Sequence, residues 1–426
     1  MNGAGPRRRA WLVPAFCFAA ALALYLPRLG VPPTYMFDET YHAYTAGRLL
    51  AGDRDAYLWN THAPAEGSAY TWNHPPVGLW LIAGGIALWG DGAFGWRFSS
   101  AVFGALGAAL AYLLALRLTG HRAPAELTMA LLLLEGLWFV QSRIGMLDIF
   151  GAVFMLGALL AFQEYLTSES AARVRWLLGT GLCLGLAIAT KWNAAYPSLA
   201  IGLVALGTAV GRHRPPLRAR AVGEVLVALA LLPAIVYLAT YLPFFATGHT
   251  AGEFVQLQRE MVHYHATLRE THNYQSRWWE WPLLLRPVWY HVTYGPGTLA
   301  HVYAQGNPAL VWLFVPAVLW LGRRWWRQRR AASVTLAIGF FGQWLPWALV
   351  PRPGFFYYFL PAVPFGVLAV SATVAELWGG RPVARAVALG YVALVALAFV
   401  FFHPIFAAVP LTPEAFSLRV WLSGWR

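Results

Sequence analysis

Residues 10–42 read AWLVPAFCFAAALALYLPRLGVPPTYMFDETYH. The apolar run over residues 10–28 is long enough to cross about 30 Å of hydrocarbon as a helix, and two adjacent carboxylates, Asp38 and Glu39, stand just beyond it. Similar runs recur through the 426 residues, of which 59% are hydrophobic and only 12% charged, whereas soluble domains carry about 25% charged residues. The sequence therefore predicts an all-α polytopic membrane protein in which a pair of acids outside the hydrocarbon has a chemical role.

The pattern of apolar runs predicts about 11 membrane spans. Two of the connections between spans, at residues 143–145 and at residue 191, would be very short. The approximate limits of the spans are 10–28, 97–117, 124–142, 146–165, 174–190, 192–210, 222–245, 307–322, 331–350, 355–377 and 383–403.

The positions of the arginines assign an orientation to these spans. When the spans alternate from a cytoplasmic N-terminus, the arginine-rich segments at residues 7–9, 212–220 and 323–330 all fall on the cytoplasmic side. Because cytoplasmic loops are enriched in Lys and Arg, this pattern predicts a cytoplasmic N-terminus and an external C-terminus. The net charge of +13 then reflects topology, so no nucleic-acid partner is predicted. The first run, which follows three arginines, resembles a retained signal anchor.

This topology leaves two long segments outside the membrane, at about residues 29–96 and 246–306. Both are rich in acids, histidines and aromatic residues, and loops of this length inside a compact protein are usually functional. We see neither an internal repeat nor a separate soluble region. We therefore expect residues 1–426 to form a single membrane-embedded catalytic domain.

The first external segment is expected to contain two short helices. Residues 38–51 predict a helix lying on the membrane, with Asp38 at its N-cap. The candidate residues for its buried face are Tyr41, Ala46, Leu49 and Leu50. Residues 75–90 are apolar but slightly short for a span and begin with two prolines, which predicts a second interfacial or re-entrant helix.

Asp38 and Glu39 are the candidate catalytic residues. The helix dipole favours a carboxylate at a helix N-terminus, so Asp38 is expected to stay ionised and to serve as a general base. Adjacent residues do not share a helix face, so one acid can face a substrate while the other supports the structure. The alternative is purely structural, with a capping Asp followed by a Glu in the first helical turn.

Two histidines accompany these acids. His42 lies four residues after Asp38, on the same helical face, and His74 stands directly before Pro75-Pro76. Asp38, His42 and His74 are therefore candidate ligands of a divalent cation, although their spacing is not diagnostic. The alternative is that His74 shapes its loop or contacts an acceptor or a phosphate. No other cofactor is predicted.

Charged residues near the external ends of the spans form a second group, which consists of Arg97, Arg143, Asp148 and Lys191. Charges at membrane depth are costly and are usually functional or paired. Arg143 and Asp148 are close enough in sequence to pair with each other. Otherwise, Arg97, Arg143 and Lys191 could hold an anionic headgroup. Arg352, in a short external turn, is a further candidate for that headgroup.

Polar residues of the second external segment form a third group. Its candidate binding residues are His272, Tyr274, Gln275 and Ser276. His263 and His265 precede them, and several tryptophans follow. Polar side chains packed among indoles suit a carbohydrate or a lipid headgroup, whereas the alternative is an aromatic belt at the membrane boundary.

Together, these motifs resemble the protein O-mannosyltransferase family of polyprenyl-phosphate-sugar-dependent glycosyltransferases, in particular its bacterial branch. No single motif is decisive, but their order and spacing are specific and extend through most of the chain. The matching pieces are Phe37-Asp38-Glu39, His74-Pro75-Pro76, Gly95-Trp96-Arg97, Ser142-Arg143 with Leu147-Asp148, Thr190-Lys191-Trp192, His272-Asn273-Tyr274-Gln275-Ser276, Trp281-Pro282 with Leu285-Arg286-Pro287, Gly306-Asn307-Pro308, and Phe356-Tyr357-Tyr358-Phe359-Leu360-Pro361-Ala362.

The resemblance implies a GT-C-like membrane fold and an inverting transfer of mannose from polyprenyl-phosphate-mannose to Ser or Thr hydroxyls of exported proteins. Asp38 matches the position of the family's catalytic base, with Glu39 beside it. The implied setting is the outer face of a bacterial cell membrane, where membrane lipids, an exported or unfolded acceptor and the secretion machinery are the expected partners. Eukaryotic members carry a large β-trefoil domain in the fourth external loop, which is too short here to hold one.

Two other functions are compatible with the residues alone. A related transferase could pass a lipid-linked sugar to a lipid or a cell-wall glycan, because its acid and its phosphate site would look alike. A lipid or sugar transporter is less favoured, because transporters tend to show repeated halves and ionisable residues at mid-membrane. Here, the charges gather at the outer ends of the spans.

Overall fold

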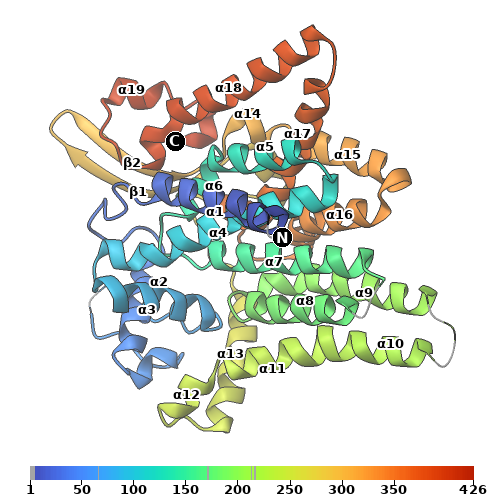
Figure 1. Cartoon of the computed structure of the whole chain (residues 1–426). Coiled ribbons are helices and arrows are strands. Elements are labelled where there is room, and N and C mark those ends of the chain that lie inside the picture. The colour runs from blue at the N-terminus through green and yellow to red at the C-terminus, as the bar shows by residue number, and fades with distance from the viewer. Residues whose placement is uncertain (1–4, 66, 170–171, 213, 215–216) are drawn as a thin grey trace.

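The computed structural model describes residues 5–65, 67–169, 172–212, 214 and 217–426. The helices are α1 (Gly5–Tyr25), α2 (Glu39–Leu50), α3 (Val77–Trp89), α4 (Ala93–Thr119), α5 (Arg122–Leu133), α6 (Gly136–Gln141), α7 (Asp148–Thr167), α8 (Ala172–Ile188), α9 (Ala195–Arg212), α10 (Leu217–Leu226), α11 (Leu232–Ala239), α12 (Leu242–Ala246), α13 (Ala251–Thr267), α14 (Pro308–Val311), α15 (Phe314–Gln328), α16 (Arg330–Trp344), α17 (Val363–Trp378), α18 (Pro382–Phe406) and α19 (Pro413–Ser417). The long helices run side by side as a bundle, and α2, α3, α12 and α13 gather at one end of it (Figure 1).

Seven helical segments of the described residues are long and apolar enough to cross a membrane. They are Ala93–Thr119, Asp148–Thr167, Trp192–Arg212, Leu217–Ala246, Arg330–Leu349, Phe356–Trp378 and Pro382–Phe406. Leu12–Tyr25 and Val77–Trp89 are apolar but shorter. The predicted class is confirmed: the chain is a helical, multi-pass membrane protein.

The predicted number of about 11 spans is not confirmed. Residues 124–142, expected to form one span, are broken after α5, because Glu135 caps α6 by accepting a hydrogen bond from Trp138 N at 2.7 Å. Residues 307–322 are divided between α14 and α15. The predicted breaks near 143–145 and 191 are both present.

Both helices expected in the first external segment are present. α2 buries Ala46 and Leu49, as expected, whereas Tyr41 and Leu50 are exposed. α3 follows the two prolines and ends at Trp89, before Gly90, whose φ of 84° is one that glycine adopts without strain. α3 packs against both α2 and α4 and so connects α2 with the bundle.

One element goes beyond the sequence prediction. β1 (Val288–Gly295) and β2 (Thr298–Ala304) form an antiparallel hairpin with a bulge between Trp289 and His291. The run VWYHVTYGPGTLAHVY at 288–303 carries the signal that could have predicted it, since β-branched and aromatic residues flank a Gly-Pro-Gly turn. The hairpin projects from the same end of the bundle as α2 (Figure 1).

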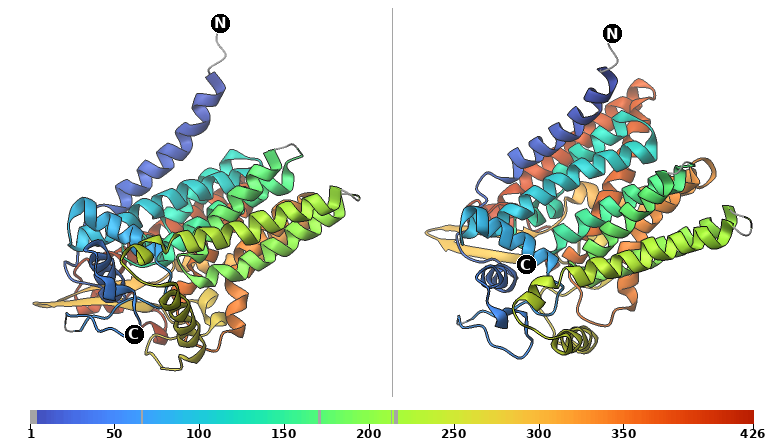
Figure 2. Two further views of the ribbon diagram at one scale, coloured as in Figure 1. Left: turned by 90° about the horizontal axis from the view of Figure 1, so that it is seen from below. Right: turned by 60° about the horizontal axis from the view of Figure 1, so that its bottom comes forward.

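The orientation in the membrane stays a prediction, which thiol labelling can test. In both views of Figure 2, the N-terminal end of α1 points away from the end of the bundle that carries α2 and the hairpin. We expect single cysteines near residues 60 and 270 to react with an impermeant reagent added outside, and cysteines near 215 and 327 to be protected until the membrane is opened. A chain with Cys17 and Cys183 replaced by Ser supplies the background. Labelling of Arg327→Cys only from outside would contradict the orientation.

Candidate active site

A cavity of about 430 Å³ lies between segments that are far apart in sequence. The start of α2, residues 69–74, Lys191, the end of α13 with the loop after it, and residues 352–358 all contribute to it. Its lining includes Asp38, His42, His74, Lys191, His272 and Arg352. The fold therefore brings together residues from all three groups that the sequence singles out.

Asp38 stands directly before α2, after a residue with an unusual backbone conformation. Phe37 has a φ of 47°, in the left-handed region that residues other than glycine rarely adopt. Its ring stacks on Tyr290, with the ring centroids 4.8 Å apart. Asp38 occupies the predicted N-cap position, but its side chain makes no capping hydrogen bond and lines the cavity instead.

The surroundings of Asp38 raise its proton affinity. Burial raises the pKa of Asp38 to about 7, against the opposing effects of Lys191 and Arg352, and the charge of Asp148 adds to the increase. Desolvation therefore outweighs the helix dipole, which was expected to keep Asp38 ionised. A carboxyl group whose pKa lies near the working pH is well matched to general-base catalysis.

Glu39 forms a buried ion pair with Arg97 that supports the start of α2. Both side chains are fully buried, and two guanidinium nitrogens donate to the two carboxylate oxygens at 2.8 Å each. Glu39 also accepts hydrogen bonds from the backbone N–H groups of Met36 and Gly145, both at 2.8 Å. Glu39 is absent from the cavity lining. The prediction of Glu39 as a second catalytic acid is corrected to a positioning role.

The guanidinium group of Arg97 uses its hydrogen-bond donors within the protein. Besides Glu39, its guanidinium donates to the carbonyl oxygens of Leu29, Pro32 and Thr34 at 3.1, 2.8 and 2.9 Å. These contacts use all five guanidinium N–H groups, so none remains for a ligand. The prediction that Arg97 binds a donor phosphate is therefore wrong, and its role is to hold the connection between α1 and α2.

Arg143 and Asp148 do not form the predicted pair among the described residues. Arg143 donates to the carbonyl oxygens of Tyr25 and Pro27, away from the cavity lining. Asp148 pairs instead with Lys191, with Nζ and Oδ1 2.8 Å apart. Arg143 is therefore a structural residue rather than a headgroup ligand, and Asp148 positions Lys191.

Lys191 and Arg352 supply positively charged side chains to the cavity lining. Lys191 Nζ lies 4.9 Å from the centre of the Tyr358 ring, and Arg352 donates to the Tyr358 hydroxyl oxygen at 3.1 Å. The Nε–H of Arg352 is buried without a hydrogen-bond partner among the described residues. A buried donor left unsatisfied in this way marks a site that water or a ligand completes.

His265, on α13, is one of the two histidines that precede the third predicted group, and the sequence assigned it no role of its own. Its Nδ1 accepts a hydrogen bond from Arg352 at 2.6 Å, and its Nε2–H donates to the carbonyl oxygen of Asn73 at 2.8 Å. Burial, together with the charge of Arg352, lowers the pKa of His265 to about 4. The neutral ring therefore orients the guanidinium. Only its place in the second external segment could have suggested this role.

His42 and His74 continue a row of rings from His265. The ring centroids are 6.0 Å apart between His42 and His74 and 5.4 Å apart between His74 and His265. Burial and the charge of Lys191 lower the pKa of His42 to about 3 and that of His74 well below its ordinary value. Where the chain is described, no group of three or more His, Cys, Asp and Glu side chains could hold a metal ion. Asp38, His42 and His74 are thus not gathered as metal ligands, and the divalent cation itself stays a prediction.

The third predicted group is only partly in the cavity. His272 lines it, and the ring Nδ1 of His272 accepts a hydrogen bond from Tyr274 N at 3.1 Å. Gln275 Oε1 accepts from His272 N at 3.1 Å, and Ser276 Oγ accepts from the indole of Trp281 at 3.0 Å. Tyr274, Gln275 and Ser276 therefore shape the loop that carries His272, and Gln275 and Ser276 line a neighbouring hollow.

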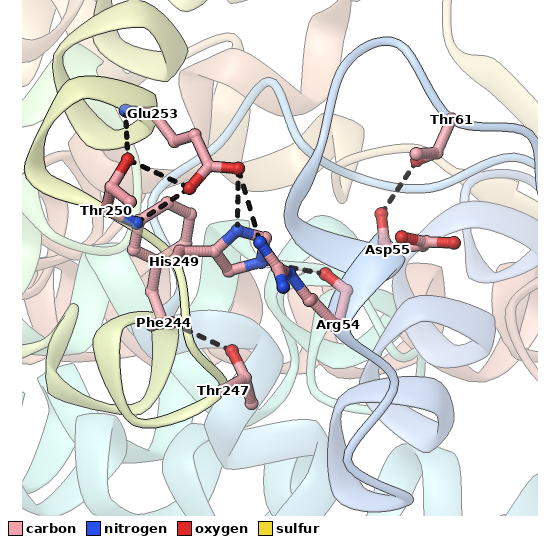
Figure 3. Close-up of polar contacts among 8 residues, drawn as sticks. All are labelled: Arg54, Asp55, Thr61, Phe244, Thr247, His249, Thr250 and Glu253. Carbon is pink, nitrogen blue, oxygen red and sulfur yellow. Dashed lines mark hydrogen bonds and ion pairs between the residues drawn. The ribbon is translucent and has the colours of Figure 1, made fainter.

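Polar contacts between the two external segments position α13 (Figure 3). The buried His249 donates from Nε2 to the carbonyl oxygen of Arg54 at 3.1 Å. The guanidinium of Arg54 lies 3.4 Å from Glu253 Oε1. Glu253 and Thr250 form a capping box at the start of α13. These contacts hold one end of the helix whose other end presents His265 to Arg352.

Two family profiles match almost the whole chain. Residues 15–248 match the family described as dolichyl-phosphate-mannose-protein mannosyltransferase, and residues 250–425 match the C-terminal four-transmembrane region of protein-O-mannosyltransferase. The chain belongs to the protein O-mannosyltransferase family. In this protein mannosyltransferase, the two matched regions meet between α12 and α13, where the second external segment begins.

Known proteins share sequence and fold with this family member. The polyprenol-phosphate-mannose–protein mannosyltransferase of Mycobacterium tuberculosis is 30% identical over 492 residues, which cover 99% of this chain and 92% of that protein. The donor-bound Pmt1-Pmt2 complex of S. cerevisiae matches with a TM-score of 0.82 and 16% identity over 98% of this chain and 93% of that one. ArnT from Cupriavidus metallidurans bound to undecaprenyl phosphate matches with a TM-score of 0.63 and 18% identity over 94% and 77%. The fold expected for this mannosyltransferase from its family is thereby confirmed.

Proposed function

We propose that this chain transfers mannose from polyprenyl-phosphate-mannose to Ser or Thr hydroxyls of exported proteins, with inversion at the anomeric carbon. The observation that carries the proposal is the single cavity that Asp38, Lys191 and Arg352 line together. Such a reaction needs a base for the hydroxyl proton and positive charge for the lipid phosphate. Membership of the protein O-mannosyltransferase family supports the same function.

In the proposed step, the Asp38 carboxylate accepts the proton of the acceptor hydroxyl as the hydroxyl oxygen attacks the anomeric carbon. The bond between that carbon and the phosphate oxygen breaks, and its electron pair leaves with the polyprenyl phosphate. Because the lipid phosphate is already a good leaving group, no strong general acid is required. Attack opposite the leaving group inverts the anomeric carbon.

Lys191 and Arg352 are assigned to the phosphate, where they stabilise the charge that accumulates as the bond breaks. Asp148 and His265 orient these two cations through the contacts described above. His74 and His272 lie in the same lining and are assigned to the sugar or the acceptor. Apolar helices below the cavity would hold the polyprenyl tail.

The proposed place of the reaction is the outer face of a bacterial cell membrane, with the N-terminus in the cytoplasm. The distribution of arginines supports this orientation. An acceptor emerging unfolded from the secretion machinery would present its hydroxyl groups at that face.

Purified protein incubated with polyprenyl-phosphate-mannose and a library of Ser- and Thr-containing peptides tests the function. Mass spectrometry should find an added hexose on Ser or Thr, and peptides with Ala at those positions serve as controls. Transfer to envelope lipid or glycan, with none to peptide, would favour the related lipid-linked sugar transferase. Adding a chelator to the same assay tests the predicted divalent cation. If the enzyme needs the cation, the chelator abolishes transfer and added divalent ion restores it.

Lys191→Ala and Arg352→Ala are each expected to weaken donor binding by about 10- to 100-fold, because each removes a charged hydrogen-bond donor from the phosphate. Binding of the acceptor peptide should change little. Titration of labelled donor lipid into protein in nanodiscs measures the effect. Arg259→Ala, on the exposed face of α13, is the control. If both alanine variants bind the donor normally, the phosphate lies elsewhere.

A further inference from the structure

A second hollow, of about 650 Å³, adjoins the proposed catalytic cavity. The 3₁₀ segment Trp278–Leu283 and the stretch from residue 347 to residue 354 form much of its wall. The hollow and the cavity share Thr271, Arg352 and Pro353. An occupant of the hollow would therefore lie next to the residue assigned to the donor phosphate.

Positive charge dominates the lining of this hollow. Its charged residues are the acid Glu280 and the arginines Arg269, Arg277, Arg286 and Arg352. Glu280 accepts a hydrogen bond from the backbone N–H of Arg277. Within the described part of the chain, Arg269 and Arg286 donate only to backbone carbonyl oxygens. None of these guanidinium groups forms an ion pair with a carboxylate of the described chain. Four guanidinium groups against one carboxylate, with no ion pair among them in the described chain, favour an anion such as phosphate.

The hollow also lies where a membrane-spanning segment ends. Arg330–Leu349 is long and apolar enough to cross a membrane, and the lining residues Trp347 and Val350 stand at its end. Leu345 and Leu349 in this region are 42% and 87% exposed. The other indoles of the lining belong to Trp278, Trp279 and Trp281. Exposed leucines beside indoles are typical of the boundary between hydrocarbon and headgroups.

We propose that this hollow binds the phosphate headgroup of an anionic membrane phospholipid, whose acyl chains lie over Leu345 and Leu349. The unpaired arginines select the phosphate, and the exposed leucines favour a ligand with hydrocarbon chains over a free anion. The consequence for catalysis rests on the proposed function, because the bound lipid shares Arg352 with the donor and therefore influences donor binding.

Native mass spectrometry of the full-length protein, released from nanodiscs with equal amounts of phosphatidylglycerol and phosphatidylcholine, tests this proposal. The wild type should retain phosphatidylglycerol preferentially. The double variant R269Q/R277Q should retain it roughly 25-fold less well, since each basic residue near an anionic headgroup contributes about fivefold. Both arginines are exposed, so the fold should survive. Arg259→Gln, an exposed arginine of α13, should behave as the wild type.

Equal retention of phosphatidylglycerol by the wild type and the double variant would overturn the proposal, as would the absence of any lipid preference. The single variant R277Q, expected to lose about fivefold, provides the same test if the double variant does not fold. Displacement of the lipid by free glycerophosphate would identify a site for soluble phosphate instead. Binding of an acidic peptide without a preference for phosphatidylglycerol would assign the hollow to the acceptor. Lipid retention is measured without mannosyl transfer. A negative result for lipid binding can therefore be told apart from a failure of the proposed function.

Discussion

Asp38→Asn is expected to slow mannosyl transfer by about 10²–10⁴-fold, which is the usual contribution of a positioned general base. The amide keeps the shape of the side chain but cannot accept the proton of the acceptor hydroxyl. Donor binding should survive, because Lys191 and Arg352 remain in place. Steady-state transfer to a peptide and titration with donor lipid measure the two effects separately.

The same residue is expected to set the pH dependence of the wild-type enzyme. Burial raises the pKa of Asp38 to about 7, and only the ionised form, which predominates above that pH, acts as a base. kcat/KM should therefore fall about tenfold for each pH unit below about 7 and level off above it. His42 and His265, with pKa values of about 3 and about 4, stay neutral through this range. The acid limb should thus disappear in Asp38→Asn.

Asp55→Asn is the matched control, since Asp55 is an exposed acid of the same external segment. It should transfer sugar at the wild-type rate. A folded Asp38→Asn protein that transfers sugar at near the wild-type rate, or that keeps the acid limb, would exclude Asp38 as the base.

Glu39→Gln is expected to lower the free energy of unfolding by about 3–5 kcal/mol, which is typical when one partner of a buried ion pair is removed. Arg97 would keep its charge in a fully buried position, with only carbonyl oxygens to accept its hydrogen bonds. Thermal unfolding in detergent measures the loss. Per folded molecule, transfer should fall less than in Asp38→Asn, because Glu39 acts only through the position of α2.

Glu224→Gln is the control for this loss of stability. Glu224 pairs with Arg220 at 3.0 Å, but that pair is at the surface, so removing it should leave the unfolding temperature unchanged. A Glu39→Gln protein with wild-type stability and a transfer rate as low as that of Asp38→Asn would contradict the positioning role. Glu39 would then take part directly in the chemical step.

The sequence by itself determined the membrane class, the breaks between several spans and the helix that begins after Asp38. These features depend on local properties: the length of an apolar run, the prolines that precede α3, and the polar residues that interrupt the hydrocarbon pattern. The resemblance of short motifs added the family and the candidate base. The β-hairpin could also have been predicted, because its sequence signal lies in one continuous stretch.

Only the tertiary structure decided which charged groups meet and how deeply they are buried. Glu39 pairs with Arg97 across 58 positions and Asp148 with Lys191 across 43, whereas the sequence suggested the nearer Arg143 for Asp148. Proximity along the chain is the only distance that a sequence shows, and packing brings together residues that it places far apart. The pKa of Asp38 has the same origin, because desolvation depends on every segment that closes over the carboxyl group.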